Sequence, residues 1–136
     1  MRPFHYAFKV KNLDETRAFY GKILGCKEGR STNTWVDFDF FGNQISAHLS
    51  DKFEPLDYCG HVDKVDVPIP HFGAIITMAH FAEIEKKLKD LKYQFIVPPQ
   101  IRYPGKPGEQ STMFILDPSG NPLEFKAFKD ESEIYS

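Results

Sequence analysis

The feature that most constrains this chain is an internal repeat, with one copy starting near Phe4 and the second near Pro70. Each copy opens with a strand-like run, continues into an amphipathic helical segment and ends with three short strand signals. His5 and His71 occupy matching places at the two starts. The repeat therefore predicts two similar modules, each with the order strand, helix, strand, strand, strand.

The predicted elements follow apolar periodicity and turn residues. The first helix is expected to begin at Asp14, an N-cap residue, and to stop at Gly25, where glycine supplies a left-handed end. In the second helix Phe81, Ile84, Leu88 and Leu91 recur at helical spacing and form one apolar stripe. The predicted strands cover residues 4–10, 27–30, 35–41 and 44–49 in the first copy, and 72–78, 94–97, 112–117 and 123–128 in the second.

Four strands with one covering helix leave the other face of a sheet bare, so the two modules are expected to pair and share a cavity. A chain of 136 residues fits a single α+β domain. Its parts are a first module over about 1–50, a linker over 51–69, a second module over about 70–129 and a tail over 130–136.

Composition narrows the class of partner. The formal net charge is -2, with 17 basic and 19 acidic residues, so neither nucleic acid nor an anionic membrane is the expected partner. Cys26 and Cys59 are too few for a disulfide framework and are expected to be thiols. The opening residues lack a signal-peptide pattern and no apolar run reaches 18 residues, so we expect a cytoplasmic protein acting on a small molecule.

Strand alternation places metal-ligand side chains at matching positions. His5 lies off the bulky face of the first strand, and His71 has the equivalent place in the second copy. Glu124, on the last strand, lies with Lys126 and away from Leu123. Two imidazoles and one carboxylate converging from three strands form the facial set that suits a divalent metal with open positions. The sequence therefore predicts His5, His71 and Glu124 as metal ligands.

A second candidate region is residues 98–110, which are rich in proline and glycine and lengthen the second copy. A connection this long is more often a binding loop than a spacer. Arg102, Tyr103 and Lys106 are its candidate contacts for an anionic substrate, and a plain solvated loop is the alternative.

Two motifs give the chain a family resemblance. They are the segment 13–20 with its Ala-Phe-Tyr ending, followed by Leu24-Gly25, and the segment 117–125, which reads Asp-Pro-Ser-Gly-Asn-Pro-Leu-Glu-Phe. With Phe4-His5, they resemble the vicinal oxygen chelate superfamily, which includes glyoxalase I, extradiol dioxygenases and fosfomycin and bleomycin resistance proteins. The resemblance covers almost the whole chain. It implies two βαβββ modules in an incomplete eight-stranded barrel around a metal, and a homodimer.

The resemblance also assigns roles to residues. It implies His5, His71 and Glu124 as ligands, and it places Ser46 where glyoxalase I has a fourth ligand, which argues against that chemistry. Ser46 is instead a candidate substrate contact. His48 occupies the strand on which extradiol dioxygenases carry an acid-base histidine, so it is the expected catalytic residue.

Within the superfamily, the chain most resembles small single-domain proteins described as predicted extradiol-type dioxygenases. Fosfomycin-modifying relatives carry a threonine where this chain has Ala7, and the dioxygenase pattern has a tyrosine where this chain has Phe114. The expected activity is O2-dependent cleavage of a catechol-like substrate, with Fe(II) favoured and Mn(II), Zn(II) or Ni(II) as alternatives. A glyoxalase-like isomerase or lyase, and a metal-free binding protein of the resistance type, are the competing interpretations.

Overall fold

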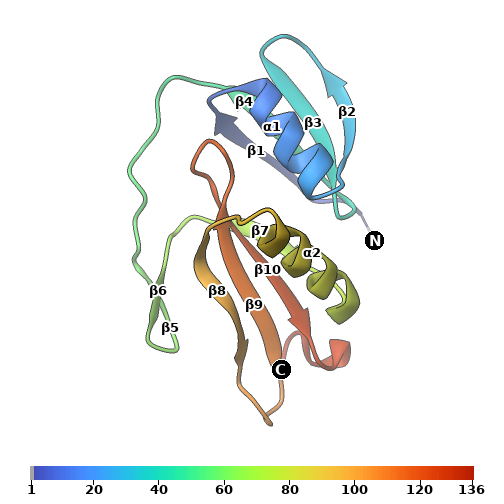
Figure 1. The fold of residues 1–136 in the computed structure, drawn as a ribbon, viewed down its shortest axis with the longest axis vertical. Coiled ribbons are helices and arrows are strands. Elements are labelled where there is room, and N and C mark those ends of the chain that lie inside the picture. Colours follow the sequence, from blue (N-terminus) through green and yellow to red (C-terminus); the bar gives the residue numbers. More distant parts are fainter. Residues whose placement is uncertain (1) are drawn as a thin grey trace. The chain divides into compact units, whose positions relative to one another are not determined.

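A computed structural model describes residues 2–136 and contains two four-stranded sheets, each accompanied by a helical segment (Figure 1). The chain divides into two compact units. The first runs through Pro55 and includes residues 117–121, and the second comprises residues 56–116 and 122–136. The predicted α+β class and the two βαβββ modules are confirmed.

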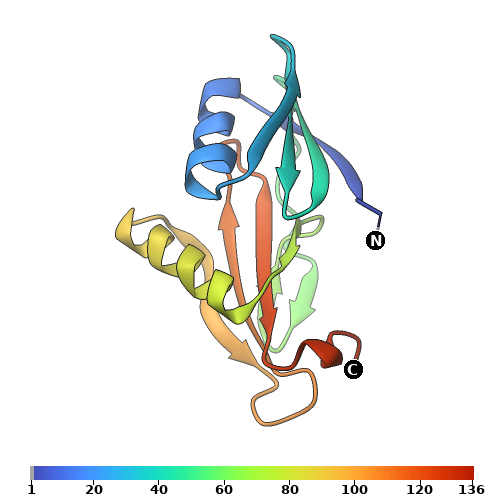
Figure 2. The same cartoon turned by 90° about the vertical axis from the view of Figure 1, so that its right-hand side faces the viewer.

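The first sheet has the spatial order β1-β4-β3-β2, with β1 parallel to β4 and the other pairs antiparallel. Its strands are β1 (His5–Val10), β2 (Lys27–Ser31), β3 (Trp35–Phe40) and β4 (Asn43–Leu49). A helical segment covers one face of this sheet and consists of α1 (Leu13–Arg17) and wider, π-type turns in η1 (Ala18–Ile23) (Figure 2). The opposite face carries His5, Ser46 and His48.

The helical segment begins and ends for local reasons. Asn12, rather than the predicted Asp14, is the N-cap, because its side-chain oxygen accepts a hydrogen bond from the Glu15 N–H at 2.8 Å. Gly25 has a φ of 74°, as expected of a glycine that follows a helix. The buried Tyr20 packs against Phe38, with ring centroids 5.5 Å apart. Aromatic packing between the helical segment and the sheet therefore forms the core of this unit.

The second sheet repeats the plan in the order β7-β10-β9-β8, with β7 parallel to β10. Its strands are β7 (Phe72–Ile75), β8 (Phe95–Arg102), β9 (Gln110–Leu116) and β10 (Pro122–Phe128). Helix α2 (Met78–Asp90) begins at Thr77, which accepts from the His80 N–H, and lies on one face of the sheet (Figure 2). Phe81, Ile84 and Leu88 of the predicted stripe are buried, whereas Leu91 is 55% exposed because α2 ends before it. A short helix η2 (Glu131–Glu133) follows β10.

Two segments differ from the predictions. The linker 51–69 contains a hairpin of β5 (Gly60–Val62) and β6 (Val65–Val67), where only a connection was expected. Val67 packs with Val97 and Phe114, so the hairpin covers part of the second sheet on the face opposite α2 (Figure 2). The predicted loop 98–110 is also shorter, because β8 continues through two prolines to Arg102. Proline is tolerated there because β8 is an edge strand.

No helix among residues 2–136 is long and apolar enough to cross a membrane.

Candidate metal centre

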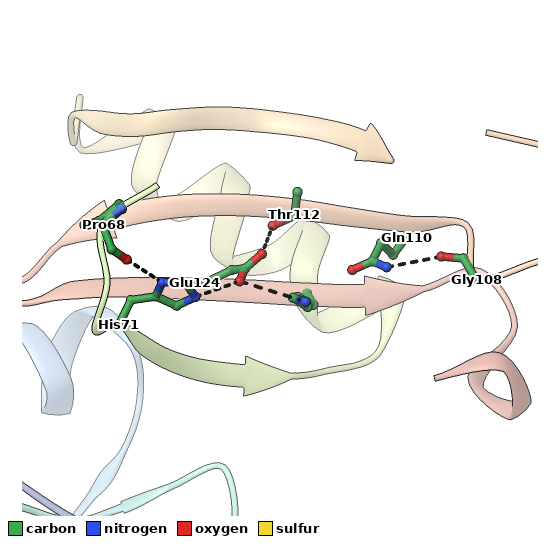
Figure 3. Close-up of polar contacts among 7 residues, drawn as sticks. Pro68, His71, Gly108, Gln110, Thr112 and Glu124 are labelled. Carbon is green, nitrogen blue, oxygen red and sulfur yellow. Dashed lines mark hydrogen bonds and ion pairs between the residues drawn. The ribbon is translucent and has the colours of Figure 1, made fainter. Parts of the chain in front are cut away.

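The face of the second sheet opposite α2 brings together a histidine and a glutamate. His71 precedes β7, and Glu124 lies in β10 opposite Gly73. The His71 Nε2 atom is 3.2 Å from Glu124 Oε1 (Figure 3). Both residues line a cavity of about 280 Å³ within the second unit. The structure thus places two of the three predicted metal ligands in contact.

Neighbouring groups hold both side chains in place. The His71 Nδ1 atom is 2.7 Å from the carbonyl oxygen of Pro68, and the imidazole ring meets Phe114 edge-on at 4.9 Å. The Thr112 hydroxyl donates to Glu124 Oε2 at 2.5 Å (Figure 3). Supporting contacts of this kind fix the orientation of metal-ligating side chains in proteins.

The pair is electrostatically coupled. The hydrogen bond with Glu124 raises the pKa of His71, against the opposing effect of burial, and the Pro68 carbonyl raises it further. Burial would raise the pKa of Glu124, but hydrogen bonds from His71 and Thr112 and the positive charge of Lys126, 4.0 Å away, together lower it. The carboxylate is therefore held in its ionised form, which is the form that binds a cation.

The donor set fits a divalent cation. When His71 donates its Nδ1 proton to Pro68, the Nε2 lone pair faces the carboxylate oxygen of Glu124, so two acceptors point at each other. Such an arrangement needs either a proton or a cation between the two atoms. An imidazole nitrogen and a carboxylate oxygen are ligands that Fe(II), Mn(II) and Zn(II) all accept.

A glycine allows the strand that follows His71 to approach Glu124 closely. A Cβ atom added to Gly73 would lie 1.5 Å from the backbone oxygen of Glu124. No side chain fits in that space. Gly73 therefore sets the distance between β7 and β10 where the histidine and the carboxylate meet.

The third predicted ligand, His5, lies in β1 of the first unit and is exposed. Its Nδ1 atom is 2.9 Å from the side-chain oxygen of Gln44, just as the Nδ1 atom of His71 is held by the Pro68 carbonyl. In both histidines Nε2 is therefore the ring nitrogen that would bind a metal. Within the described part of each unit, no three histidine, cysteine, aspartate or glutamate side chains form a group that could hold a metal ion. Each unit by itself thus supplies only part of the predicted ligand set.

The predicted catalytic and substrate residues of the first sheet lie on its uncovered face. His48 is exposed and pairs across the strands with Trp35, with ring centroids 6.1 Å apart. Ser46 is buried and donates to Asp37 at 2.5 Å. Trp35 and Asp37 also line a cavity of about 620 Å³ within this unit.

The residues of the predicted binding loop separate into two environments. Arg102 is the last residue of β8 and is buried, whereas Tyr103 and Lys106 are exposed in the 103–109 turn that joins β8 to β9. Tyr103 has a φ of 55°, so the chain reverses direction just after Arg102.

Sequence reasoning missed two residues of the site. Thr112 pairs with Lys126, which lies two residues after Glu124 on β10. Strand alternation therefore places Thr112 on the same face of the sheet as Glu124. The Pro68 carbonyl had no recognisable signal, since backbone acceptors are set by the path of the chain rather than by residue type.

Comparison with known proteins decides the family. The family model for the Glyoxalase/Bleomycin resistance protein/Dioxygenase superfamily matches residues 2–125. The chain belongs to this superfamily. A search of curated proteins gave no match.

Several solved structures have a similar fold and match this chain over almost its full length. A glyoxalase/bleomycin resistance protein/dioxygenase from Alicyclobacillus acidocaldarius is 34% identical, with a TM-score of 0.80, and the match covers 98% of this chain and 96% of that one. The fosfomycin resistance protein FosX from Listeria monocytogenes is 22% identical, with a TM-score of 0.72 and coverage of 96% and 95%. A virulence protein from Salmonella typhimurium is 22% identical, with a TM-score of 0.65 and coverage of 94% and 97%. The last two likenesses concern the fold alone.

Proposed function

We propose that this protein is a metal-dependent enzyme of the vicinal oxygen chelate type that acts on a small molecule. The observation that carries the proposal is the contact between His71 Nε2 and Glu124 Oε1, with each side chain held by its own further hydrogen bond. His71 and Glu124 would hold the metal, and the resemblance adds His5 as the third ligand. A bound divalent ion would supply a Lewis acid for two adjacent oxygens of the substrate.

The finer proposal is an extradiol-type dioxygenase with Fe(II), or Mn(II), acting on a catechol-like compound. His48 would move a proton of the substrate hydroxyl, because an imidazole exchanges protons near neutral pH. Its exposure on the uncovered face of the first sheet leaves its ring free to meet a substrate. Ser46, Tyr103 and Lys106 are the further proposed substrate contacts, and a homodimer in the cytoplasm is the expected form.

Two alternatives share the fold. An isomerase or lyase would use the same metal ligands without O2, and a binding protein of the resistance type would use no metal. The contact between His71 and the buried Glu124 favours a metal-dependent function over metal-free ligand binding. Burying a carboxylate is unfavourable unless it is paired or bound to a cation.

Metal binding is tested first. Wild-type protein freed of metal by a chelator is titrated anaerobically with Fe(II), Mn(II) and Zn(II), and the variants H5A, H71A and E124A are compared with H61A, which changes an exposed histidine. We expect one ion per chain in wild type and H61A, and a loss of affinity of at least 100-fold in the other three. Equal affinity in H71A or E124A would contradict the metal centre.

Oxygen uptake then separates the enzymatic alternatives. The Fe(II)-loaded protein is tested over a panel of catechols that differ in their ring substituents, with uptake of O2 as the readout. Ring cleavage with O2 consumption supports the dioxygenase. Metal binding without O2 uptake on any catechol would reject the dioxygenase and leave the isomerase or lyase.

A further inference from the structure

A buried arginine on the face of the candidate metal centre has no hydrogen-bond partner for its guanidinium group among the residues that the structure describes. Arg102 is only 5% exposed, and its Nε, Nη1 and Nη2 atoms make no hydrogen bond within residues 2–136. Arg102 pairs with Gln110, and Gln110 lies two residues from Thr112 on β9. Strand alternation therefore places Arg102 on the same face of the second sheet as Thr112 and Glu124.

No acidic side chain of the surrounding elements neutralises this guanidinium. Glu124 is the single acid on that face in the described strands β7–β10, and it is held by His71 and Thr112. Beyond the sheet, Glu109 accepts from the Gly105 N–H and Glu133 accepts from the Gly108 N–H. Glu109 also lies 3.8 Å from Lys129 Nζ, and neither carboxylate forms an ion pair with Arg102.

A buried charge without a partner opposes folding unless it serves a ligand. The guanidinium group offers a planar fork of N–H donors that matches the oxygens of a carboxylate or a phosphate group. We propose that Arg102 binds an anionic group of the substrate. This inference rests on the proposed function, because it names the substrate class of the same site.

The strand register sets the distance between the two ends of such a substrate. Arg102 pairs with Gln110, which pairs with Phe128, and Glu124 lies four residues earlier on β10. At about 3.4 Å per residue along β10 and about 4.8 Å for each of the two strand spacings, the backbone positions of Glu124 and Arg102 are roughly 17 Å apart. The side chains of Arg102 and Glu124 shorten this gap, and the anionic group of the proposed substrate lies apart from the oxygens that meet the metal.

Anion binding is tested on the whole chain without metal. Wild type is titrated calorimetrically with benzoate, with inorganic phosphate and, as a neutral control, with benzamide. We expect saturable binding of one anion and none of benzamide, and the tighter of the two anions identifies the chemical group. R102Q should bind at least tenfold more weakly and R102K should fall between R102Q and wild type. R30Q, a matched change at an exposed arginine, should equal wild type.

Thermal stability separates ligand binding from a structural role. If Arg102 serves a ligand, R102M without anion melts at or above the wild-type temperature, and the anion no longer raises its melting temperature. A lower melting temperature of R102M without anion would overturn the proposal, as would unchanged binding in R102Q or no binding of either anion to wild type.

The metal titration keeps the two proposals apart. R102M should bind metal as wild type does, and H71A should bind the anion as wild type does. If wild type binds metal but no anion, the role of Arg102 is rejected and the proposed function stands. If wild type binds the anion but no metal, the proposed function is rejected and anion binding by Arg102 stands.

Discussion

Tyr20 and Asp117, 97 positions apart in the sequence, are joined by a buried hydrogen bond of 2.8 Å from the tyrosine hydroxyl to Asp117 Oδ2. The other carboxylate oxygen of Asp117 accepts from the backbone N–H groups of Ser119 and Asn121. Ser119 in turn accepts from the Lys11 N–H. The Asp-Pro-Ser-Gly-Asn turn, found in the sequence as a family signature, is therefore the part of the later chain that is built into the first unit.

The substitution Y20F should lower the free energy of unfolding by about 1 to 3 kcal/mol, because it removes a donor from a buried carboxylate. Burial already outweighs the hydrogen bonds to Asp117 and raises the pKa of that carboxyl, so the loss of one donor raises it further. Urea unfolding at pH 7 measures the effect. The control Y58F alters an exposed tyrosine and should stay within about 0.5 kcal/mol of wild type. Equal stability of Y20F and wild type would show that the bond contributes nothing.

Thr112 should influence metal affinity without contacting the metal. Its hydroxyl donates to Glu124 Oε2, which orients the opposite oxygen toward His71. Loss of a supporting hydrogen bond of this kind weakens metal binding by about 10- to 100-fold, so we expect that range for T112V. Metal titration of T112V and of T34V, which changes an exposed threonine, provides the comparison. Affinity of T112V equal to that of T34V would mean that Glu124 is oriented by other contacts.

The metal-free protein should show a pH-dependent stability set by His71 and Glu124. The pKa of His71 is raised from about 6.5, so its stabilising effect is complete below that pH and is lost as the pH rises through the higher folded value. The pKa of Glu124 is lowered from about 4.5, so its effect is complete above that pH and is lost as the pH falls through the lower folded value. The pair therefore stabilises the metal-free fold most between about pH 4.5 and 6.5.

Denaturant unfolding at several pH values from 4 to 9, with chelator present, measures this profile. Wild type should lose stability above pH 6.5, and E124Q should lose less over the same range. The variant D66N removes the partner of the exposed His61 and should keep the wild-type profile. Excess metal should reverse the slope, because protons and the cation compete for the same ligand atoms. A flat profile in metal-free wild type would contradict the coupling.

The sequence predicted most of the fold because both halves follow simple periodic patterns. Phe81, Ile84 and Leu88 of the predicted stripe are buried and Gly25 follows the first helical segment as expected, whereas Leu91 is exposed because α2 ends at Asp90. The hairpin of β5 and β6 was missed because its turn, Asp63-Lys64, has positive φ angles without glycine or asparagine to announce them. The length of β8 was missed because the two prolines in the segment suggested a loop, whereas an edge strand accepts them.

The candidate site was predictable only in part. Strand alternation places Glu124 on the face of the second sheet opposite α2 and the repeat places His71 beside it, and these two residues are in contact. The unpartnered state of Arg102 was not predictable, because the sequence does not show which acids bond elsewhere. Within the predicted binding loop, burial distinguishes Arg102 from the exposed Tyr103 and Lys106. The roles of His5 and His48 stay predictions.

The substitution G73A should disrupt the meeting of β7 and β10. The added methyl group would lie 1.5 Å from the backbone oxygen of Glu124, so the strands must separate. Overpacking of this kind costs about 3 kcal/mol or more, and we expect metal affinity to fall together with stability. The control G21A adds a methyl whose nearest neighbour is 3.9 Å away and should leave both properties unchanged. Wild-type metal affinity in a stable G73A protein would show that the strands can move without displacing Glu124.

His48 should affect the rate of reaction but not the binding of metal. Its ring lies beside Trp35 on the uncovered face of the first sheet, and it is not among the proposed ligands. If it moves a substrate proton, H48Q should lower kcat by about 10²- to 10⁴-fold on any substrate found in the catechol panel. The pH profile of kcat should also lose one limb, which a purely structural role would not cause. The control H61Q should retain full activity, because His61 is exposed and pairs with Asp66. A fall in metal affinity in H48Q, with kcat per bound metal unchanged, would instead assign His48 to the metal centre.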